Sequence, residues 1–170
     1  MPKSTSTYTF RAAINRDAIA IQNLVFSVLN SYGLRPDPEG TDTDLNDLEK
    51  AYFHSGGYFC VIENPEAQIV GCFGLYPIDR HMAEVRKMYL LPEARGQGLG
   101  KASLTRLLDF AQAHGFQRLH LETNRVLKEA IALYLKFGFL PLKGHVHSGR
   151  CDQAYYLDLK EQNHVEPQQL

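Results

Sequence analysis

The feature that most constrains this chain is a glycine-rich stretch that follows an apolar strand and opens a helix. Residues 84–91 alternate as a strand does, Pro92 ends the run, and residues 95–101 read Arg-Gly-Gln-Gly-Leu-Gly-Lys at the start of the apolar-periodic segment 98–114. Glycines tolerate positive φ and let an anion approach the backbone closely. Because a helix N-terminus presents N–H groups and the positive end of the helix dipole, the stretch predicts a phosphate or pyrophosphate site.

Two better-known phosphate loops do not fit this spacing. A P-loop needs glycine where Arg95 stands and Ser or Thr where Ala102 stands. A dinucleotide-binding fingerprint needs its third glycine where Lys101 stands, and it follows the first strand, whereas this loop lies in the middle of the chain. The spacing therefore disfavours a nucleotide- or dinucleotide-dependent enzyme.

The spacing Arg/Gln-x-x-Gly-x-Gly/Ala, present at residues 95–100, resembles the pyrophosphate loop of the GNAT superfamily of acetyl-CoA-dependent N-acetyltransferases. Two further segments follow at the distances that this family shows. Residues 119–124 read Leu-His-Leu-Glu-Thr-Asn, and residues 130–139 end in a pattern that resembles the family's Tyr-x-Lys-x-Gly-Phe. The close resemblance covers about residues 82–140, and the general order of elements extends it over almost the whole chain.

The periodicity of apolar residues predicts the order of the elements. Strands are expected at 8–13, 58–63, 69–76, 82–91, 119–123, 141–147 and 154–159, and helices at 15–32, 44–53, 98–114 and 128–137. This order predicts an α/β (α+β) domain of three layers, in which about four helices flank a mixed, mostly antiparallel sheet of six to seven strands, as in the GNAT family. We expect one domain over residues 1–161 and a disordered polar tail over 162–170.

Composition limits the binding partners and the cellular location that can be expected for this protein. With 44% hydrophobic and 22% charged residues and a net charge of −1, the chain of 170 residues resembles an ordinary soluble protein. It has no concentrated basic face for nucleic acid, no apolar run of about 20 residues for a membrane and no signal sequence. The cysteines Cys60, Cys72 and Cys151 are odd in number and lack metal-ligand spacing, which predicts buried reduced thiols, no metal and a cytoplasmic location.

The resemblance implies acetyl-CoA as cosubstrate and names the residues that would hold it. In this family the strand before the loop offers backbone N–H groups to the acetyl carbonyl and the pantetheine arm, here those of Met88 and Leu90. Asn124 would bond the cofactor arm or, alternatively, cap the helix that follows, and Lys136 would reach a phosphate or remain solvated. The full expected set is Met88, Tyr89, Leu90, Arg95, Gly96, Gln97, Gly98, Leu99, Gly100, Lys101, Asn124, Tyr134 and Lys136.

Three residues are candidates for the chemistry. Tyr134 matches the family tyrosine that faces the cofactor sulfur and would protonate the departing thiolate; the alternative is a core aromatic. Glu84 stands four residues before Met88, so strand alternation predicts that both side chains share a face, and some family members carry their base at this offset. The alternative for Glu84 is an ion pair with Arg86 or Lys87. Glu122 could hold a water and act as a relay instead of Glu84 or together with it.

The acceptor site is the part that the sequence defines least. In this fold the first two helices and the last two strands wall it, and the carboxylates there either receive a cationic amine or form the solvated face of a short helix. His145 and His147 share a strand face but lack a third metal ligand. The charged and histidine side chains of these walls are Asp42, Asp44, Asp47, Glu49, His145, His147 and Arg150.

The sequence thus predicts an N-acetyltransferase that moves the acetyl group of acetyl-CoA directly to a primary amine of a small molecule, or of a peptide, in a ternary complex. We expect a monomer or homodimer. The lack of a suitably placed cysteine argues against a covalent acyl-enzyme. The alternative is a non-catalytic acyl-CoA-binding regulatory module, which the presence of Tyr134 and Glu84 disfavours.

Overall fold

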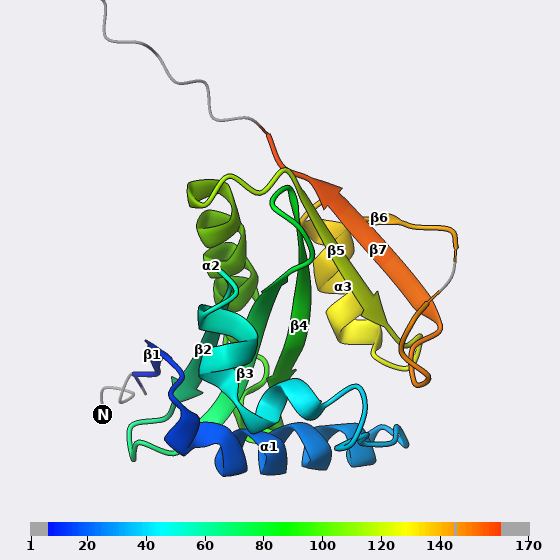
Figure 1. Ribbon diagram of the computed structural model, residues 1–170. Coiled ribbons are helices and arrows are strands. Elements are labelled where there is room, and N and C mark those ends of the chain that lie inside the picture. Colours follow the sequence, from blue (N-terminus) through cyan, green and yellow to red (C-terminus); the bar gives the residue numbers. More distant parts are fainter. Residues whose placement is uncertain (1–6, 145, 161–170) are drawn as a thin grey trace, which may run out of the picture.

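The computed structural model describes residues 7–144 and 146–160, whose strands form one sheet (Figure 1). His145 and the expected tail 162–170 lie outside the described residues. Seven strands in the described part pair in the order β1-β2-β3-β4-β5-β7-β6, antiparallel throughout except between β4 and β5. They are β1 (Thr9–Ala12), β2 (Tyr58–Glu63), β3 (Ile69–Pro77), β4 (Met82–Leu90), β5 (Arg118–Thr123), β6 (Leu140–Pro141) and β7 (Gln153–Asp158).

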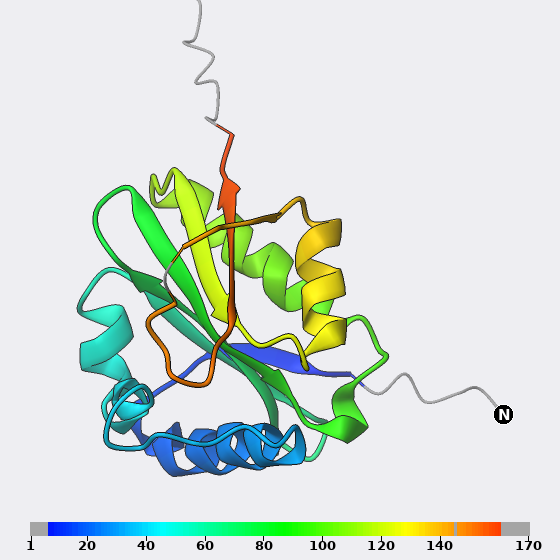
Figure 2. The same ribbon diagram turned by 90° about the vertical axis from the view of Figure 1, so that its right-hand side faces the viewer.

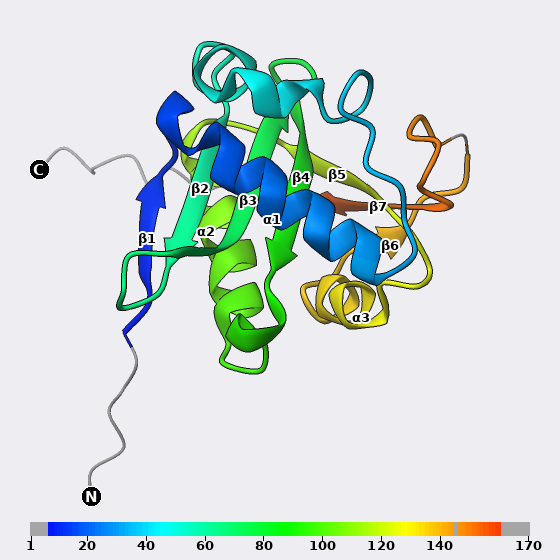
Figure 3. The same ribbon diagram turned by 90° about the horizontal axis from the view of Figure 1, so that it is seen from below.

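Helices cover both faces of the sheet, which gives three layers (Figures 2 and 3). The helical elements are η1 (Asn15–Asp17), α1 (Ala18–Ser31), η2 (Thr43–Asn46), η3 (Glu49–Phe53), η4 (Pro92–Ala94), α2 (Leu99–Ala113) and α3 (Lys128–Lys136). Ile21, Val25 and Leu29 bury the apolar stripe of α1 on one face, and Leu104 and Leu107 bury that of α2 on the other. Each such side chain contributes about 1.5–3 kcal/mol on burial. The predicted three-layer α/β fold is confirmed.

Some predicted elements differ in extent. The helix expected over residues 44–53 is two short turns, η2 and η3, and the strand expected over 141–147 is limited to the two residues of β6. Propensity was a weak guide here, because both segments are fixed by contacts with distant parts of the chain rather than by their own periodicity.

The sheet opens between β4 and β5. Residues Met82–Glu84 pair with Arg118–His120, and beyond them β5 pairs only with β7 while β4 diverges (Figure 1). On its other side, β4 carries a bulge in which Lys87 and Met88 both lie opposite Phe73, and Lys87 has a positive φ of 55°. A bulge increases twist and bends the strand, which helps to aim this part of β4 away from β5.

The bulge also resets the alternation of side chains along β4. Val85 and Met88 both pack against the cluster under α2, whereas Glu84, next to Val85 in the strand, points to the opposite face. The prediction that Glu84 and Met88 share a face is therefore wrong, because a regular strand was assumed and one extra residue inverts the pattern.

Candidate active site

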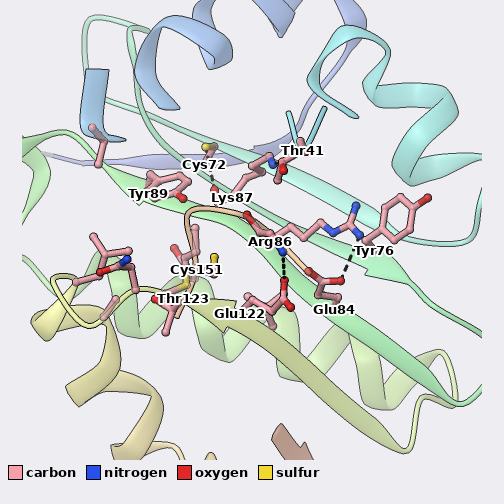
Figure 4. Close-up of a pocket in the computed structure, with 18 of the residues that line it drawn as sticks. Thr41, Cys72, Tyr76, Glu84, Arg86, Lys87, Tyr89, Glu122, Thr123 and Cys151 are labelled. Carbon is pink, nitrogen blue, oxygen red and sulfur yellow. Dashed lines mark hydrogen bonds and ion pairs between the residues drawn. The ribbon is translucent and has the colours of Figure 1, made fainter. Parts of the chain in front are cut away.

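The gap between β4 and β5 is the centre of a cleft of about 1460 Å³. We call one part of it the loop half, made of residues 95–101 with Met88, Leu90 and Tyr134. We call the other part the ionic half, made of Thr41, Asp44, Tyr76, Glu84, Arg86 and Glu122, several of which Figure 4 shows gathered along β4 and β5. Because the sheet is open here, the gap connects its two faces.

The loop half offers a row of backbone donors. In the described chain, the six successive N–H groups of residues 96–101 have no hydrogen-bond partner, and the first helical bond of this end runs from Ala102 N–H to the carbonyl of Gly98 at 3.0 Å. Gly96 and Gly98 have φ of 73° and 78°, and a Cβ on either would meet no protein atom within 4 Å. The backbone is therefore exposed to the cleft, as an anion site at a helix N-terminus requires.

The side chains of this loop are mostly occupied elsewhere. Arg95 donates to the carbonyl of Leu90 from Nε at 3.1 Å and from Nη2 at 3.0 Å. Gln97 donates to the hydroxyl of Tyr8 at 2.9 Å, and Leu99 is buried in the core. Among the loop's predicted binding residues, the glycines and Lys101 line the cleft, and Arg95 does so while holding the end of β4.

The divergent end of β4 also directs N–H groups into the gap. Leu91 donates to the carbonyl of Val70 on β3 at 2.8 Å, so alternation aims the N–H groups of Leu90 and Met88 away from β3. The ring of Tyr89 lies on the α1 side, where burial raises the pKa of its hydroxyl although Arg150 acts in the opposite direction. Met88 and Leu90 thus contribute backbone N–H groups to the loop half, whereas the side chain of Tyr89 lies on the other face of the sheet.

Tyr134 lies in the wall of the loop half, 6% exposed on α3. Gly138, with a φ of 93°, turns the chain so that Phe139 N–H donates to the carbonyl of Tyr134 at 3.0 Å and its ring packs 5.7 Å from the tyrosine ring. This explains the Tyr-x-Lys-x-Gly-Phe spacing. In the described chain no group bonds to the Tyr134 hydroxyl; burial, then Tyr89 and Cys151, raise its pKa, so it stays protonated.

Two predicted cofactor residues have other positions. The amide of Asn124 donates to the carbonyl of Arg150 at 2.9 Å and accepts from Val126 N–H at 3.0 Å, so this side chain forms the turn before α3, as in the alternative given for it. Lys136 is exposed at the end of α3 and is not among the residues that line the cleft. Asn124 still lines the cleft, whereas Lys136 does not, so a contact between Asn124 and the cofactor arm stays a prediction.

Glu84 and Arg86 form an ion pair in the ionic half. Nη2 of Arg86 donates to Oε2 of Glu84 at 3.2 Å, and the guanidinium lies 3.8 Å above the ring of Tyr76 (Figure 4). The side chains of Glu84 and Arg86 are 17% and 27% exposed. The alternative predicted for Glu84, pairing with Arg86, is therefore present, but the pair lines the cleft instead of the outer surface.

Glu122 is held by the segment between β6 and β7. Its Oε1 accepts from the backbone N–H of His147 and contacts Nδ1 of the same residue at 3.2 Å, and its Oε2 accepts from Ser148 N–H at 3.2 Å. The carboxylate is 8% exposed. Both oxygens are thus engaged, which leaves Glu122 less able than Glu84 to take a proton directly.

Beneath the ionic half lies a buried network that ties three segments together, residues 41–42, 87 and 150. Asp42, whose side chain is fully buried, accepts two bonds of 2.7 Å from Arg150, and Nζ of Lys87 lies 2.8 Å from its Oδ1. Lys87 also donates to the carbonyl of Thr41 at 3.2 Å. Burial alone would raise the pKa of Asp42, but Arg150 and Lys87 outweigh it and lower the pKa to about 2.

Asp44 extends this network toward the cleft. The hydroxyl of Tyr52 donates to its Oδ2, which also lies 4.0 Å from Nη1 of Arg86, while its buried Oδ1 has no hydrogen bond and only an ion-pair contact of 3.4 Å with Lys87. The prediction that these carboxylates form a solvated helix face is wrong for Asp42 and Asp44, because they neutralise buried cations. Asp47 is exposed, where it bonds Asn15.

Cys151 also lies in the cleft wall, half-buried, whereas Cys60 and Cys72 are buried as expected. Cys151 therefore differs from the prediction of buried thiols, and the prediction that no cysteine is suitably placed as a nucleophile depends on the state of this thiol. Burial raises the pKa of the Cys151 thiol, which keeps it protonated and weakly nucleophilic at neutral pH.

Within residues 7–144 and 146–160 no group of three His, Cys, Asp or Glu side chains gathers as a metal site would need. None of the helices in those ranges is both long and apolar enough to cross a membrane.

Comparison with known proteins gives one consistent result. The model of the acetyltransferase (GNAT) family matches residues 24–139. The chain is 37% identical over 142 residues to the uncharacterized N-acetyltransferase YjgM of Escherichia coli, covering 77% of this chain and 84% of that protein. A GNAT-family acetyltransferase from Staphylococcus aureus superposes with a TM-score of 0.85 at 22% identity, over 91% of this chain and 100% of that one. Spermidine N-acetyltransferase from Vibrio cholerae, solved with CoA and spermine, gives a TM-score of 0.66 at 20% identity, over 89% of this chain and 95% of that one. The protein described here belongs to the GNAT family of acetyltransferases.

Proposed function

We propose that this protein transfers the acetyl group of acetyl-CoA directly to a primary amine of a small molecule. The observation that carries the proposal is the row of six unpartnered N–H groups, residues 96–101, which opens onto the same cleft as Tyr134 and Glu84. The family membership and the N-acetyltransferase description of the Escherichia coli relative support the same reaction.

Acetyl-CoA, when bound, supplies an activated thioester. The N–H groups of Gly96 to Lys101 would grip its pyrophosphate, and Lys101 adds a positive charge at the rim. The N–H groups of Met88 and Leu90, aimed into the gap, would donate to the thioester carbonyl as negative charge develops on its oxygen. Donors held in place in this way stabilise the transition state because they need no reorganisation.

The amine must be neutral to attack, although a free alkylammonium has a pKa near ~10. Glu84 is the better base, because one of its oxygens accepts from Arg86 and the other has no donor among the described residues. A carboxylate acts on such an amine by selecting its minor neutral form or by passing the proton through water. Glu122 is a relay candidate, held beside the gap by the 147–148 backbone.

Tyr134 would donate its proton, or a hydrogen bond, to the departing thiolate. Its raised pKa keeps the hydroxyl protonated at neutral pH. The half-buried thiol of Cys151, whose raised pKa keeps it protonated at neutral pH, supports direct transfer in a ternary complex over an acyl-enzyme. The free cysteines in the described chain favour a reducing, cytoplasmic location. We also infer that the protein is a monomer or a homodimer.

The test is product detection with a panel of primary amines, amino acids and polyamines. Free CoA is measured as released thiol and the acetyl amide by mass spectrometry, with an amine-free reaction as control for thioester hydrolysis. The proposal predicts one acetyl amide for each CoA released. Tight acetyl-CoA binding without any acetyl amide would instead identify a regulatory acyl-CoA-binding module.

A further inference from the structure

The ionic half presents an unsatisfied guanidinium. Arg86 has five N–H donors, of which one bonds to Glu84. Among the described residues, neither its Nε nor its Nη1 group has a hydrogen-bond acceptor. The nearby Oδ2 of Asp44 lies 4.0 Å from Nη1, which is too far for a hydrogen bond. The side chain is largely buried, stacked on Tyr76, and still lines the cleft. Nη2 keeps a second N–H, and this group together with the free N–H of Nε or of Nη1 on the same edge of the guanidinium matches a carboxylate with two parallel bonds.

Glu84, beside it, is the complementary group. Its Oε2 accepts from Arg86 at 3.2 Å, and its Oε1 has no donor among the described residues. The cleft therefore presents one cation and one anion next to each other, each with hydrogen-bonding capacity left over. A ligand that carries an ammonium and a carboxylate close together can pair its carboxylate with Arg86 and its ammonium with Glu84. Opposite charges then alternate among these four groups.

The set of ion pairs connected to Arg86 balances in charge without a ligand, and Glu122, the remaining carboxylate of the ionic half, is held outside that set by the backbone N–H groups of His147 and Ser148. Asp42, Asp44 and Glu84 supply three negative charges, and Lys87, Arg86 and Arg150 supply three positive charges, all within one connected set of ion pairs. A net-neutral ligand leaves that balance intact. A polyamine would bring an additional cation against Arg86 in a half-buried cleft, where unpaired charge is costly.

Resting on the proposed acetyl transfer, we infer that the acceptor is a zwitterionic α-amino acid. Arg86 binds its carboxylate, and Glu84 faces its α-amino group and removes the proton. Tyr76 fixes the plane of the guanidinium and so the direction of the fork. Arg86 is thus the residue that determines acceptor class.

The experiment compares matched acceptors at saturating acetyl-CoA: the standard L-amino acids, their carboxamides, the corresponding carboxyl-free amines, and spermidine. The wild type should show kcat/KM about 10- to 150-fold higher for an amino acid than for its carboxamide, as expected for one charge-assisted bidentate contact. In Arg86→Gln this ratio should fall to about 1, and Arg86→Lys should restore part of it. Arg80→Gln, an exposed arginine outside the cleft, is the matched control and should keep the full ratio.

The outcomes separate the two proposals. A wild type that acetylates carboxamides, carboxyl-free amines or spermidine as well as amino acids overturns the acceptor assignment and leaves acetyl transfer standing. So does a ratio that survives in Arg86→Gln, shown to be folded by its unchanged calorimetric affinity for CoA. If no compound in the panel is acetylated while acetyl-CoA binds, the acceptor assignment and the proposed function both fail.

Discussion

Apart from the side chains of Lys101 and Tyr134, the polar groups of the loop half belong to the backbone of one stretch, residues 88–101, whereas those of the ionic half are side chains from four segments, residues 41–44, 76, 84–86 and 122. The first half exposes N–H groups that need only a strand end, two positive-φ glycines and a helix start. The second exists only after residues 42, 87 and 150 have met in the folded chain. The proposed cofactor binding in this cleft therefore depends on local sequence, and the proposed acceptor recognition depends on tertiary contacts.

This difference has an energetic consequence. A change at Gly96 or Gly98 removes binding at the cost of local backbone strain alone, because a side chain added there meets no protein atom within 4 Å. A change in the ionic half disturbs buried ion pairs, and breaking one such pair typically costs about 3–5 kcal/mol. Stability and acceptor recognition should therefore be coupled in the ionic half and separable in the loop half.

The largest effect should come from Tyr134→Phe, which removes a hydroxyl and keeps the ring that packs on Phe139. Turnover should fall by about 10²–10⁴-fold, the range of general acid catalysis, with little change in calorimetric affinity for acetyl-CoA. Leu135→Ala, on the exposed side of α3, is the control. A loss of less than about twofold at saturating substrates would assign Tyr134 to packing alone.

Gly98→Val should weaken CoA binding by about 10²-fold or more, because the new side chain projects into the space of the pyrophosphate and several N–H contacts are lost. Gly115→Val is a matched control: Gly115 also has a positive φ, 79°, and open space around its Cβ, but it lies outside the cleft. Both variants should lose similar stability in thermal unfolding, and only Gly98→Val should lose CoA. Equal CoA affinity in the two would contradict the loop assignment.

Much of the loop half was readable from the sequence because its determinants are contiguous. The strand, the proline and the glycines stand in order, and Gly138 and Phe139 mark the helix that carries Tyr134. Lys87 was not predicted as buried, since nothing local shows that Asp42 will neutralise it. The bulge at Lys87–Met88 was also missed, because it depends on pairing with β3. Two adjacent cations, Arg86 and Lys87, inside a central strand were the one available signal.

Glu84→Gln should lower kcat/KM by about 10²-fold at neutral pH, with less loss as pH rises and the free amine becomes abundant. The wild-type rate should rise with pH along an acidic limb that shifts or disappears in the variant. Initial rates across pH, with Glu122→Gln in parallel, decide the assignment. An unchanged profile in Glu84→Gln and an altered one in Glu122→Gln would move the base or its relay to Glu122.

The smallest effect concerns acid stability. Because the pKa of Asp42 is about 2 in the fold and near ~3.9 when unfolded, the unfolded state binds more protons between these values. The free energy of unfolding should therefore fall by about 2 kcal/mol through Asp42 alone as pH drops from about 4 to about 2. Urea unfolding at each pH should show this loss in the wild type and in Asp158→Asn, an exposed control, and a smaller one in Asp42→Asn. Equal losses of unfolding free energy in all three proteins would mean that Arg150 and Lys87 do not lower the pKa of Asp42 as their contacts indicate.

Both halves of the cleft are expected to act in one step, with the acetyl group passing directly between two bound substrates. Initial velocities measured while acetyl-CoA and the amine are both varied test it most directly, in the wild type and in Cys151→Ala, the variant without the half-buried cleft thiol. Direct transfer predicts intersecting double-reciprocal lines in both proteins. It also predicts that mass spectrometry detects no acetylated protein after incubation with acetyl-CoA alone. Parallel lines, with an acetylated protein that is absent in Cys151→Ala, would show a covalent intermediate and contradict it.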